Sequence, residues 1–291
     1  MSTTVDSAQE LAAFLRTRRQ RLAPGEVGLP EHRRARRTPG LRREEVAKLA
    51  GVSVDYVVRL EQGRGLRPSP EVLDALAGAL RLSDDERLYL FDLVRQRPAY
   101  RPRKADEAGP LAQLVHDLSP LPAMVMNHRQ DILAWNREMT GLMLDFGELP
   151  ESQRNGMWLC MLHPRFREFY LDRELMIREG IADLRATWAA HPDDTALAEL
   201  VEELRGGSPE FDRLWAQRDV QVRARGDKRL LHPVAGELTV RFEVLASLQD
   251  PDQRLIIYRA ADPASQVALD AIRNRTSPAP AGQPRPAGPA A

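Results

Sequence analysis

Residues 41–63 constrain the fold of this chain most strongly, because they predict two short helices separated by a tight turn. The first helix is expected over residues 42–50, where Val46, Leu49 and Ala50 recur at helical spacing and would face inward. A pair of helices joined in this way either packs inside a helical core or places its second helix in the major groove of DNA. The stretch therefore predicts an all-helical amino-terminal region.

The turn and the second helix carry specific signals. Gly51 would supply the sharp turn, and the Ser53 hydroxyl would cap the second helix by accepting a hydrogen bond from a free N–H group. Val57 and Leu60 then follow at helical spacing, and Gly63 would stop the helix. This combination favours a DNA-binding pair over a helical hairpin that only fills a core.

The charge distribution divides the chain into two parts. The whole sequence is neutral, with 42 Lys+Arg and 42 Asp+Glu, yet residues 1–104 hold 21 basic and 14 acidic side chains. A basic region joined to an acidic remainder is typical of a nucleic-acid-binding module that carries a second domain. A dense basic cluster adjoins the helix pair and is expected to contact phosphates rather than form a solvated loop. The cluster comprises Arg33, Arg34, Arg36, Arg37, Arg42 and Arg43.

The segment EEVAKLAGVS, followed by LEQG and PSPEVLDALAGAL, resembles the Cro and phage-repressor class of helix-turn-helix domain, the XRE family, over residues 8–97. The resemblance implies that Arg43 contacts phosphate, and that Val54, Asp55 and Arg59 read base edges. The family usually has glutamine at the place of Arg43, so an arginine would either strengthen phosphate binding or change what is read. The full predicted DNA-binding set is Arg37, Arg42, Arg43, Ser53, Val54, Asp55, Tyr56, Arg59 and Arg64.

Three more helices of this region follow from amphipathic periodicity and from capping residues. They are expected over residues 7–22, 70–81 and 83–95, which with the helix pair gives five helices in a domain spanning residues 7–97. Prolines cannot continue the last helix, so a linker is expected over residues 98–109.

A second domain is predicted over residues 110–262, since 291 residues with 43% hydrophobic content suffice for two buried cores. Residues 122–126 and 131–135 would form two strands around a polar turn. Asn136 would then cap a helix that carries Met139, Leu142, Met143 and Phe146. Longer helices are expected over residues 165–190, 193–205 and 208–217.

After these helices, apolar residues recur at every second position, which indicates strands. Strands are expected around residues 220–222, over 238–244 and over 254–258, with Gly226-Asp227 as a hairpin turn. Two strands, a block of helices and further antiparallel strands predict an α+β domain with one antiparallel sheet. The fold class expected for the chain is therefore an all-α five-helix DNA-binding domain followed by an α+β domain.

The segments WNREMTGLM, HPDDTALAELVEELRGGSPEFDRLWAQRDV and HPVAGELTVRFEVLASLQDPDQRLIIY are similar to the ligand-binding domain of MmyB-like transcription regulators. The order of elements also resembles a PAS-like sensor domain, and the resemblance covers residues 111–260. It implies an apolar effector such as a fatty acid. Beyond it, the proline and alanine content of residues 277–291 predicts a disordered tail.

Methionine and tryptophan are concentrated in the second domain. Apart from Met1, every methionine lies between residues 124 and 176, and all four tryptophans lie in the same domain. Methionine is flexible and polarizable, so such a group suits a pocket for an apolar ligand, although each residue alone is better explained as core. The predicted ligand-binding set is Met124, Met126, Trp135, Met139, Met143, Phe146, Trp158, Met161, Phe169, Met176 and Trp215.

Signals for catalysis, metal binding and cofactors are weak. The six histidines show no paired metal-ligand spacing, and the sequence has neither a phosphate-cradling glycine loop nor a nucleophile elbow. The single Cys160 excludes an intrachain disulfide and is expected to be a small buried apolar residue rather than a reactive thiol. We therefore expect no enzyme activity, no metal and no cofactor.

No segment approaches the roughly 18 consecutive apolar residues that a membrane span needs, so a cytoplasmic protein is expected. The combined features predict a sequence-specific transcription regulator that binds double-stranded operator DNA as a homodimer. An apolar effector with unequal affinity for two conformers would change its operator affinity. Two alternatives remain: a constitutive regulator whose second domain only dimerises or binds a partner, and a second domain that is an enzyme or redox sensor.

Overall fold

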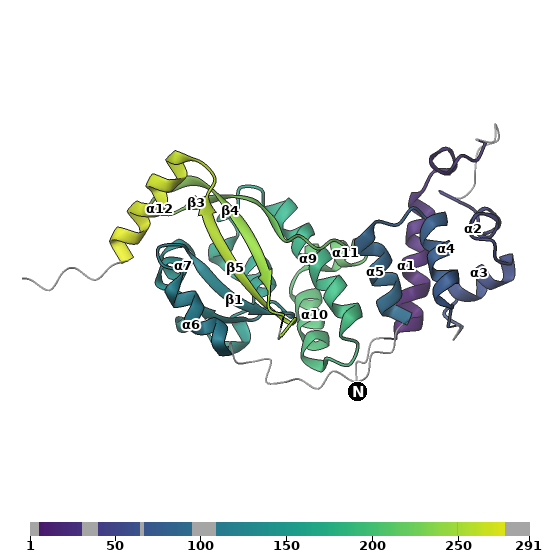
Figure 1. Cartoon of the computed structure of the whole chain (residues 1–291), viewed down its shortest axis with the longest axis horizontal. Helices are drawn as coiled ribbons and strands as arrows, with labels where there is room; N and C mark the ends of the chain where they lie inside the picture. The colour runs from purple at the N-terminus through teal and green to yellow at the C-terminus, as the bar shows by residue number, and fades with distance from the viewer. Residues whose placement is uncertain (1–5, 31–39, 65–66, 95–108, 249, 277–291) are drawn as a thin grey trace, which may run out of the picture.

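The computed structural model describes residues 6–30, 40–64, 67–94, 109–248 and 250–276. They form an amino-terminal domain (residues 6–94) and a carboxy-terminal domain (residues 109–276), which lie end to end along the long axis (Figure 1). Apart from residue 109, the predicted linker lies outside the described residues, and so does the predicted tail. Within the described ranges, no helix is both long enough and apolar enough to cross a membrane.

The described part of the amino-terminal domain contains five α-helices, as the sequence predicts. They are α1 (Ser7–Arg21), α2 (Arg43–Ala50), α3 (Val54–Glu61), α4 (Pro70–Ala79) and α5 (Asp84–Val94), with the short 3-10 helix η1 (Pro24–Val27) after α1. The Ser53 hydroxyl caps α3 by accepting a hydrogen bond from the backbone N–H of Tyr56, 3.1 Å away. Gly51 has a φ of 67°, a left-handed conformation that glycine adopts without steric cost, so the turn falls there.

The core of this domain is formed by apolar residues from all five helices, among them Phe14, Leu60, Leu76 and Leu90. Leu49 was expected to face inward, but 37% of it is exposed. The buried face of α2 is centred on Val46, Ala47 and Ala50, which leaves Leu49 at its edge. Tyr56 belongs to the predicted DNA-binding set, which would require an exposed side chain, but it is half-buried against the core.

The carboxy-terminal domain is built on one five-stranded antiparallel sheet in the order β2-β1-β5-β4-β3. Its strands are β1 (Ala123–Asn127), β2 (Ile132–Trp135), β3 (Arg225–His232), β4 (Gly236–Ala246) and β5 (Gln253–Ala260). Its helices are α6 (Gly109–Asp117), α7 (Arg137–Leu142), α8 (Gly156–Leu162), α9 (Arg173–Ala190), α10 (Thr195–Gly207), α11 (Pro209–Trp215) and α12 (Pro263–Thr276), with the 3-10 helices η2 (Phe146–Glu148), η3 (Glu151–Gln153) and η4 (Pro164–Phe166). The predicted fold class is confirmed.

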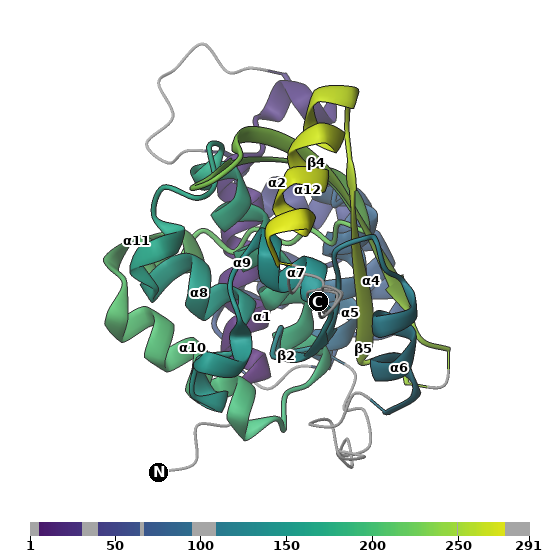
Figure 2. The same cartoon turned by 90° about the vertical axis from the view of Figure 1, so that its left-hand side faces the viewer.

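Different helices cover the two faces of the sheet, with α6 on one side and α8 to α11 on the other (Figure 2). Ala123 and Val125 of β1 pack with Val115 of α6. Met124 and Ile256 belong to the cluster on the opposite face, together with residues of α7 and α8. Because side chains alternate along a strand, β1 is buried on both faces, and this explains its continuous apolar sequence.

The predicted hairpin turn at Gly226-Asp227 is wrong, because both residues lie inside β3 and pair with Phe242 and Arg241 of β4. The chain reverses instead just before Gly236, which has a φ of 73°. A Cβ at position 226 would lie 2.9 Å from Cε1 of Phe242. Glycine therefore makes room for the aromatic ring here rather than turning the chain.

Several helix predictions are also corrected. The sequence predictions omitted α6, α8 and α12, and α12 extends the domain beyond its predicted end. α9 begins at Arg173 rather than at 165, because residues 164–166 form η4 and Tyr170 makes a β-bridge to β3. Phe146 was expected on the helix that Asn136 caps, but α7 ends before it and Phe146 lies in η2.

The two domains meet through α1 and α5 on one side, and through α9 and the segment after α11 on the other (Figure 1). Ala189 of α9 and Val220 belong to the buried core of the amino-terminal domain. Val220 was expected in a strand, and this prediction is wrong because residues 219–223 have no regular secondary structure. Its apolar side chain is explained by this interface instead.

Arg185 of α9 is buried in the interface, with 1% of the residue exposed. Its Nη1 donates to Oε1 of Glu10 at 2.7 Å, and the Tyr89 hydroxyl donates to the same oxygen at 2.8 Å. Its Cζ lies 3.9 Å from the centroid of the Trp215 ring, and its Nη2 donates to the Trp215 carbonyl oxygen. A charge of the carboxy-terminal domain is thus paired with a carboxylate of α1.

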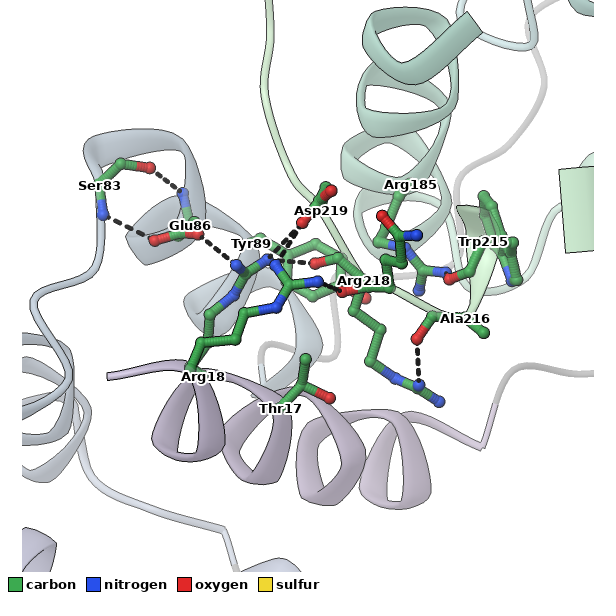
Figure 3. A network of polar contacts seen from close by, with 12 residues as sticks. Thr17, Arg18, Ser83, Glu86, Tyr89, Arg185, Trp215, Ala216, Arg218 and Asp219 are labelled. Carbon is green, nitrogen blue, oxygen red and sulfur yellow. Dashed lines mark hydrogen bonds and ion pairs between the residues drawn. The ribbon is translucent and has the colours of Figure 1, made fainter. Parts of the chain in front are cut away.

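Arg18 makes the reverse contact, from α1 toward the carboxy-terminal domain (Figure 3). Its Nη1 lies 3.0 Å from Oε1 of Glu86, and its Nη2 donates to the carbonyl oxygen of Arg218. Nearby, Arg21 Nη2 donates to the carbonyl oxygen of Gln217 at 2.6 Å. The interface therefore combines apolar packing with charges that are paired across it.

Replacing Arg185 tests this interface. The Arg185→Ala variant should lower the free energy of unfolding by about 3 kcal/mol, because it removes the buried cation nearest to the Glu10 carboxylate and leaves Arg218 Nε, 3.3 Å away, as the remaining ion-pair partner among the described residues. Urea denaturation followed by circular dichroism measures the change. Arg178→Ala, on the same helix, removes an exposed pair with Glu174 and should cost less than about 0.5 kcal/mol. Equal losses in both variants would contradict the assigned role of Arg185.

Candidate DNA-binding surface and ligand cavity

The second helix of the helix-turn-helix pair, α3, has one buried face and one exposed face. Val57 and Leu60 are buried, whereas Val54, Asp55 and Arg59 are exposed. α3 lies at the end of the amino-terminal domain that is farthest from the carboxy-terminal domain (Figure 1). Its exposed face is therefore open to a partner as large as a DNA duplex.

Arg43 is positioned by a buried acid. Glu61 is 2% exposed, and its Oε2 accepts a hydrogen bond from Nε of Arg43 at 2.7 Å. Its Oε1 accepts from Nε of Arg19 at 2.6 Å, so two arginines share one carboxylate and the group keeps a net positive charge. Because 43% of the Arg43 side chain remains exposed, the residue both stabilises the helix pair and presents positive charge beside α3.

The other predicted DNA-binding residues differ in how accessible they are. Arg42 and Arg64 are exposed, as a phosphate contact requires. Ser53 is exposed, but its hydroxyl is engaged as the cap of α3. Tyr56 is half-buried, and burial raises the pKa of its phenol. Arg37 lies outside the described residues.

The carboxy-terminal domain contains a cavity of about 160 Å³ between the sheet, α8 and α9. Its apolar lining combines methionines with aromatic and aliphatic side chains. These apolar residues are Met124, Met126, Ile132, Met143, Met157, Leu159, Phe166, Met176, Phe242 and Ile256. The remaining lining residues are Gln130, Gly156, Cys160, Tyr170, Glu179, Gly180, Asp183, Arg223, Lys228, Arg254 and Tyr258.

The predicted ligand-binding set only partly coincides with this lining. Met124, Met126, Met143 and Met176 line the cavity. The other predicted residues are absent from its walls, because they fill the surrounding cores or surfaces. They are Met139 and Phe146 in the core, Trp135 packed edge-on against Phe146, Phe169 beside Phe166, Trp158 donating to Glu203, Met161 among the helices, and Trp215 at the domain interface.

The aromatic wall of the cavity lies outside the predicted ligand-binding set. Phe166 and Tyr170 come from one segment, Phe242 from β4 and Tyr258 from β5, so these three parts of the chain meet only in the folded domain. The alternation along β4 could have indicated that Phe242 faces the same side as the apolar residues around it. No local signal distinguishes Lys228, which lies in a strand between exposed charged residues.

The charged lining residues fall into two groups. Arg254 Nη1 pairs with Asp183 Oδ2 at 2.8 Å, and Arg223 Nη1 pairs with Glu179 Oε1 at 2.8 Å. Lys228 is different, because its ammonium donates to the Tyr258 hydroxyl at 3.1 Å and lies 4.7 Å from the centroid of the Phe242 ring. Among the described residues, no carboxylate makes a salt bridge with it.

Two further lining groups are held uncharged. Burial raises the pKa of the Cys160 thiol and raises that of the Tyr170 phenol well above its usual value. Cys160 is half-buried at the cavity wall, so its thiol is not activated as a nucleophile. The cavity therefore offers apolar contacts, hydroxyl groups, two arginine–carboxylate pairs and the ammonium of Lys228.

Folding also changes how the scattered histidines are interpreted. The rings of His128 and His191 stack with centroids 4.2 Å apart, and Asp252 lies against His191. The expectation that no metal binds rested on linear spacing alone, and spacing does not detect ligands that different turns bring together.

Comparison with family models gives two matches. Residues 10–90 match a helix-turn-helix domain, and residues 109–272 match the MmyB-like transcription regulator ligand binding domain, which covers more than half of the chain. The chain belongs to the MmyB-like transcription regulators. A search of curated proteins gives no match to it.

The regulator therefore joins a helix-turn-helix DNA-binding domain to a ligand-binding domain, and it is a ligand-responsive transcription regulator. Both matched families are regulator domains rather than enzyme families. The first match falls on α1 to α5 and the second on α6 to α12, so the cavity lies wholly inside the ligand-binding domain.

Base reading by α3 is tested at Arg59. Arg59→Ala should relax preference at one or two base pairs of an operator selected from random DNA, at a cost of about 1 to 3 kcal/mol, because an exposed arginine on this helix can bond a guanine edge. Arg42→Ala should instead weaken binding to all DNA sequences by the same factor. It should also lower the slope of log affinity against log salt concentration by about one. Binding isotherms on matched and mutated operators at several salt concentrations measure both.

Arg87→Ala is the control, because Arg87 is exposed on α5 and pairs with Asp74. It should leave operator affinity unchanged. A uniform loss for Arg59→Ala across all sequences would show that Arg59 contacts the backbone rather than bases.

Proposed function

We propose that this regulator senses a carboxylic acid with an apolar chain, of the fatty-acid class, in the cavity beside α9. The observation that carries the proposal is Lys228, whose ammonium faces aromatic rings and a tyrosine hydroxyl inside a largely apolar cavity. A buried carboxylate needs a cation and hydrogen-bond donors, and Lys228 offers both. The arginines of the lining already pair with their own carboxylates.

The rest of the lining suits the chain of such an acid. Met124, Met126, Met143 and Met176 can change rotamer at little cost, so they adapt to chains of different length and shape. The cavity volume of about 160 Å³ gives room for on the order of ten water-sized groups. A medium-length alkyl chain matches this space in the resting protein.

α9 supplies a route from the cavity to DNA. The helix contributes Met176 and Asp183 to the cavity wall, and Arg185 and Ala189 to the contact with the DNA-binding domain. A helix is stiff along its axis, so a ligand that shifts the cavity side of α9 must also strain the interface. The effector then acts by favouring one of two arrangements of the domains.

A homodimer on a two-fold operator completes the proposal, because one small helix-turn-helix domain contacts few base pairs. In a dimer, the effector would change the distance and orientation between the two DNA-binding domains. This change decides whether both domains can bind their half-sites at the same time. The cytoplasm, where DNA and acyl compounds are both accessible, is the compartment that this function implies.

The role of Lys228 is tested with decanoate. Lys228→Gln keeps a donor for Tyr258 but removes the charge, and it should weaken decanoate binding by roughly 10- to 100-fold, as expected for a charge-assisted hydrogen bond. Its affinity for decanol should change little, since the alcohol carries no charge. Isothermal titration calorimetry compares the two ligands.

Arg229→Gln is the matched control, because Arg229 lies next along β3 and forms an exposed pair with Asp172. Its decanoate affinity should equal that of the wild type. If the wild type and Lys228→Gln bound decanoate with equal affinity, the carboxylate of the ligand would not contact Lys228. Absence of binding for any apolar ligand would favour a second domain that only dimerises.

Coupling to DNA is tested at the interface. Decanoate should change operator affinity by a factor on the order of ten, and operator must change decanoate affinity by the same factor. Trp215→Phe, which alters the partner of Arg185 but lies outside the cavity lining, should reduce this factor and leave decanoate affinity without DNA unchanged. A coupling factor of one in the wild type would mean that the cavity binds decanoate but that this binding does not regulate DNA affinity.

A further inference from the structure

A cluster of three side chains outside the ligand cavity has the composition of a metal site. His128 lies in the turn between β1 and β2, His191 follows the end of α9, and Asp252 lies in the turn between β4 and β5. One ligand atom from each lies within 4.8 Å of the others. None of the three lines the cavity.

Both histidine rings are oriented by a second hydrogen bond. Nε2 of His128 lies 2.7 Å from Oδ2 of Asp194, and Nδ1 of His191 lies 3.0 Å from the Thr187 carbonyl oxygen. Histidines that bind metals usually donate their other ring N–H to a carboxylate or a backbone carbonyl, which fixes the ring and its tautomer. Thr187 thus holds the His191 ring by the nitrogen remote from Asp252, and Asp194 holds the His128 ring through Nε2.

The cluster is buried and electrically suited to a cation. His128 is 1% exposed and His191 is 9% exposed. The neighbouring Arg129 pairs with Asp131 at 2.8 Å and with Asp194 at 3.3 Å, so its positive charge is already neutralised. Two imidazoles and one carboxylate are the ligands that borderline divalent ions such as zinc prefer.

We propose that His128, His191 and Asp252 bind a divalent transition-metal ion of the zinc class, with a fourth position left for water. Zinc holds nitrogen and oxygen ligands at about 2.0 to 2.2 Å, which places the ligand atoms about 3.5 Å apart. Nε2 of His191 and Oδ1 of Asp252 are 3.0 Å apart, a hydrogen-bond distance, so they must separate by about 0.5 Å to share the ion. The His128 ring stacks on that of His191 at an angle of 22°, so it must turn about its side-chain bonds and weaken its hydrogen bond to Asp194 to direct a nitrogen at the ion.

The ion would fasten the end of α9 to two turns of the sheet. α9 also carries the cavity residue Asp183 and the interface residue Arg185. The metal therefore sets the resting position of the helix that joins the ligand-binding domain to the DNA-binding domain. This role is structural, and it is independent of whether the cavity takes a fatty acid.

Zinc alone tests the site in the full-length protein after dialysis against EDTA. Calorimetric titration should show one high-affinity Zn²⁺ per chain, and Zn²⁺ should raise the melting temperature in a way that EDTA reverses. Asp252→Asn retains an acceptor for His191 but not the negative charge, and it should weaken Zn²⁺ binding roughly tenfold or more. His191→Gln should do the same.

His163→Gln is the control, because His163 lies at the end of α8 and is not part of the cluster. It should bind Zn²⁺ as the wild type does. The proposal is overturned if the wild type binds no stoichiometric Zn²⁺, or if the two cluster variants bind it unchanged. Variants that lose the fold are recognised by circular dichroism, and the wild-type titration then decides the question alone. If the protein binds no Zn²⁺, the expected decanoate binding is unaffected, so the two proposals can fail independently of each other.

Discussion

A buried guanidinium, that of Arg185, holds the two domains in one arrangement. Removing a charge from water costs several kcal/mol unless the charge is paired with good geometry. Arg185 finds its carboxylate on Glu10 of the other domain, and its aromatic contact on Trp215 of its own domain. Separating the domains would leave one of the two charges without its partner until water reached it. The domains are therefore joined by a packed and ion-paired interface, while each keeps its own apolar core.

The position of α9 follows from this constraint. The helix is fixed near its carboxy-terminal end by Arg185 and Ala189, while its first half forms a wall of the cavity. Gly180 lies within the cavity wall, between Met176 and Asp183, and a Cβ there would approach the Met157 sulfur to 2.5 Å. α8 and α9 thus touch at the cavity wall itself. The methionine packing of the cavity and the contact with the DNA-binding domain therefore lie on one continuous helix.

The sequence predicted the helix-turn-helix well because its signals are local. Gly51 and Ser53 act within one turn of their own positions, and the structure confirms both. The cavity was predicted only as a region rich in methionine, since its aromatic wall joins residues such as Tyr170 and Phe242 that are distant in sequence. Gly226 shows the limit most clearly. Glycine is needed at this position because the ring of Phe242 on the next strand leaves no room for a Cβ. A turn rule that considers only neighbours in sequence therefore gives the wrong prediction.

The carboxylate of Glu61 has a consequence for any surface that Arg43 meets. A long side chain that is free in solution loses rotamer entropy when it binds, at a cost of about 0.5 to 1.5 kcal/mol. Arg43 is already held by Glu61 through its Nε, so much of this entropy is lost when the protein folds. Its terminal nitrogens are thus preorganised, and the salt dependence of a contact they make can be large without a matching entropic penalty.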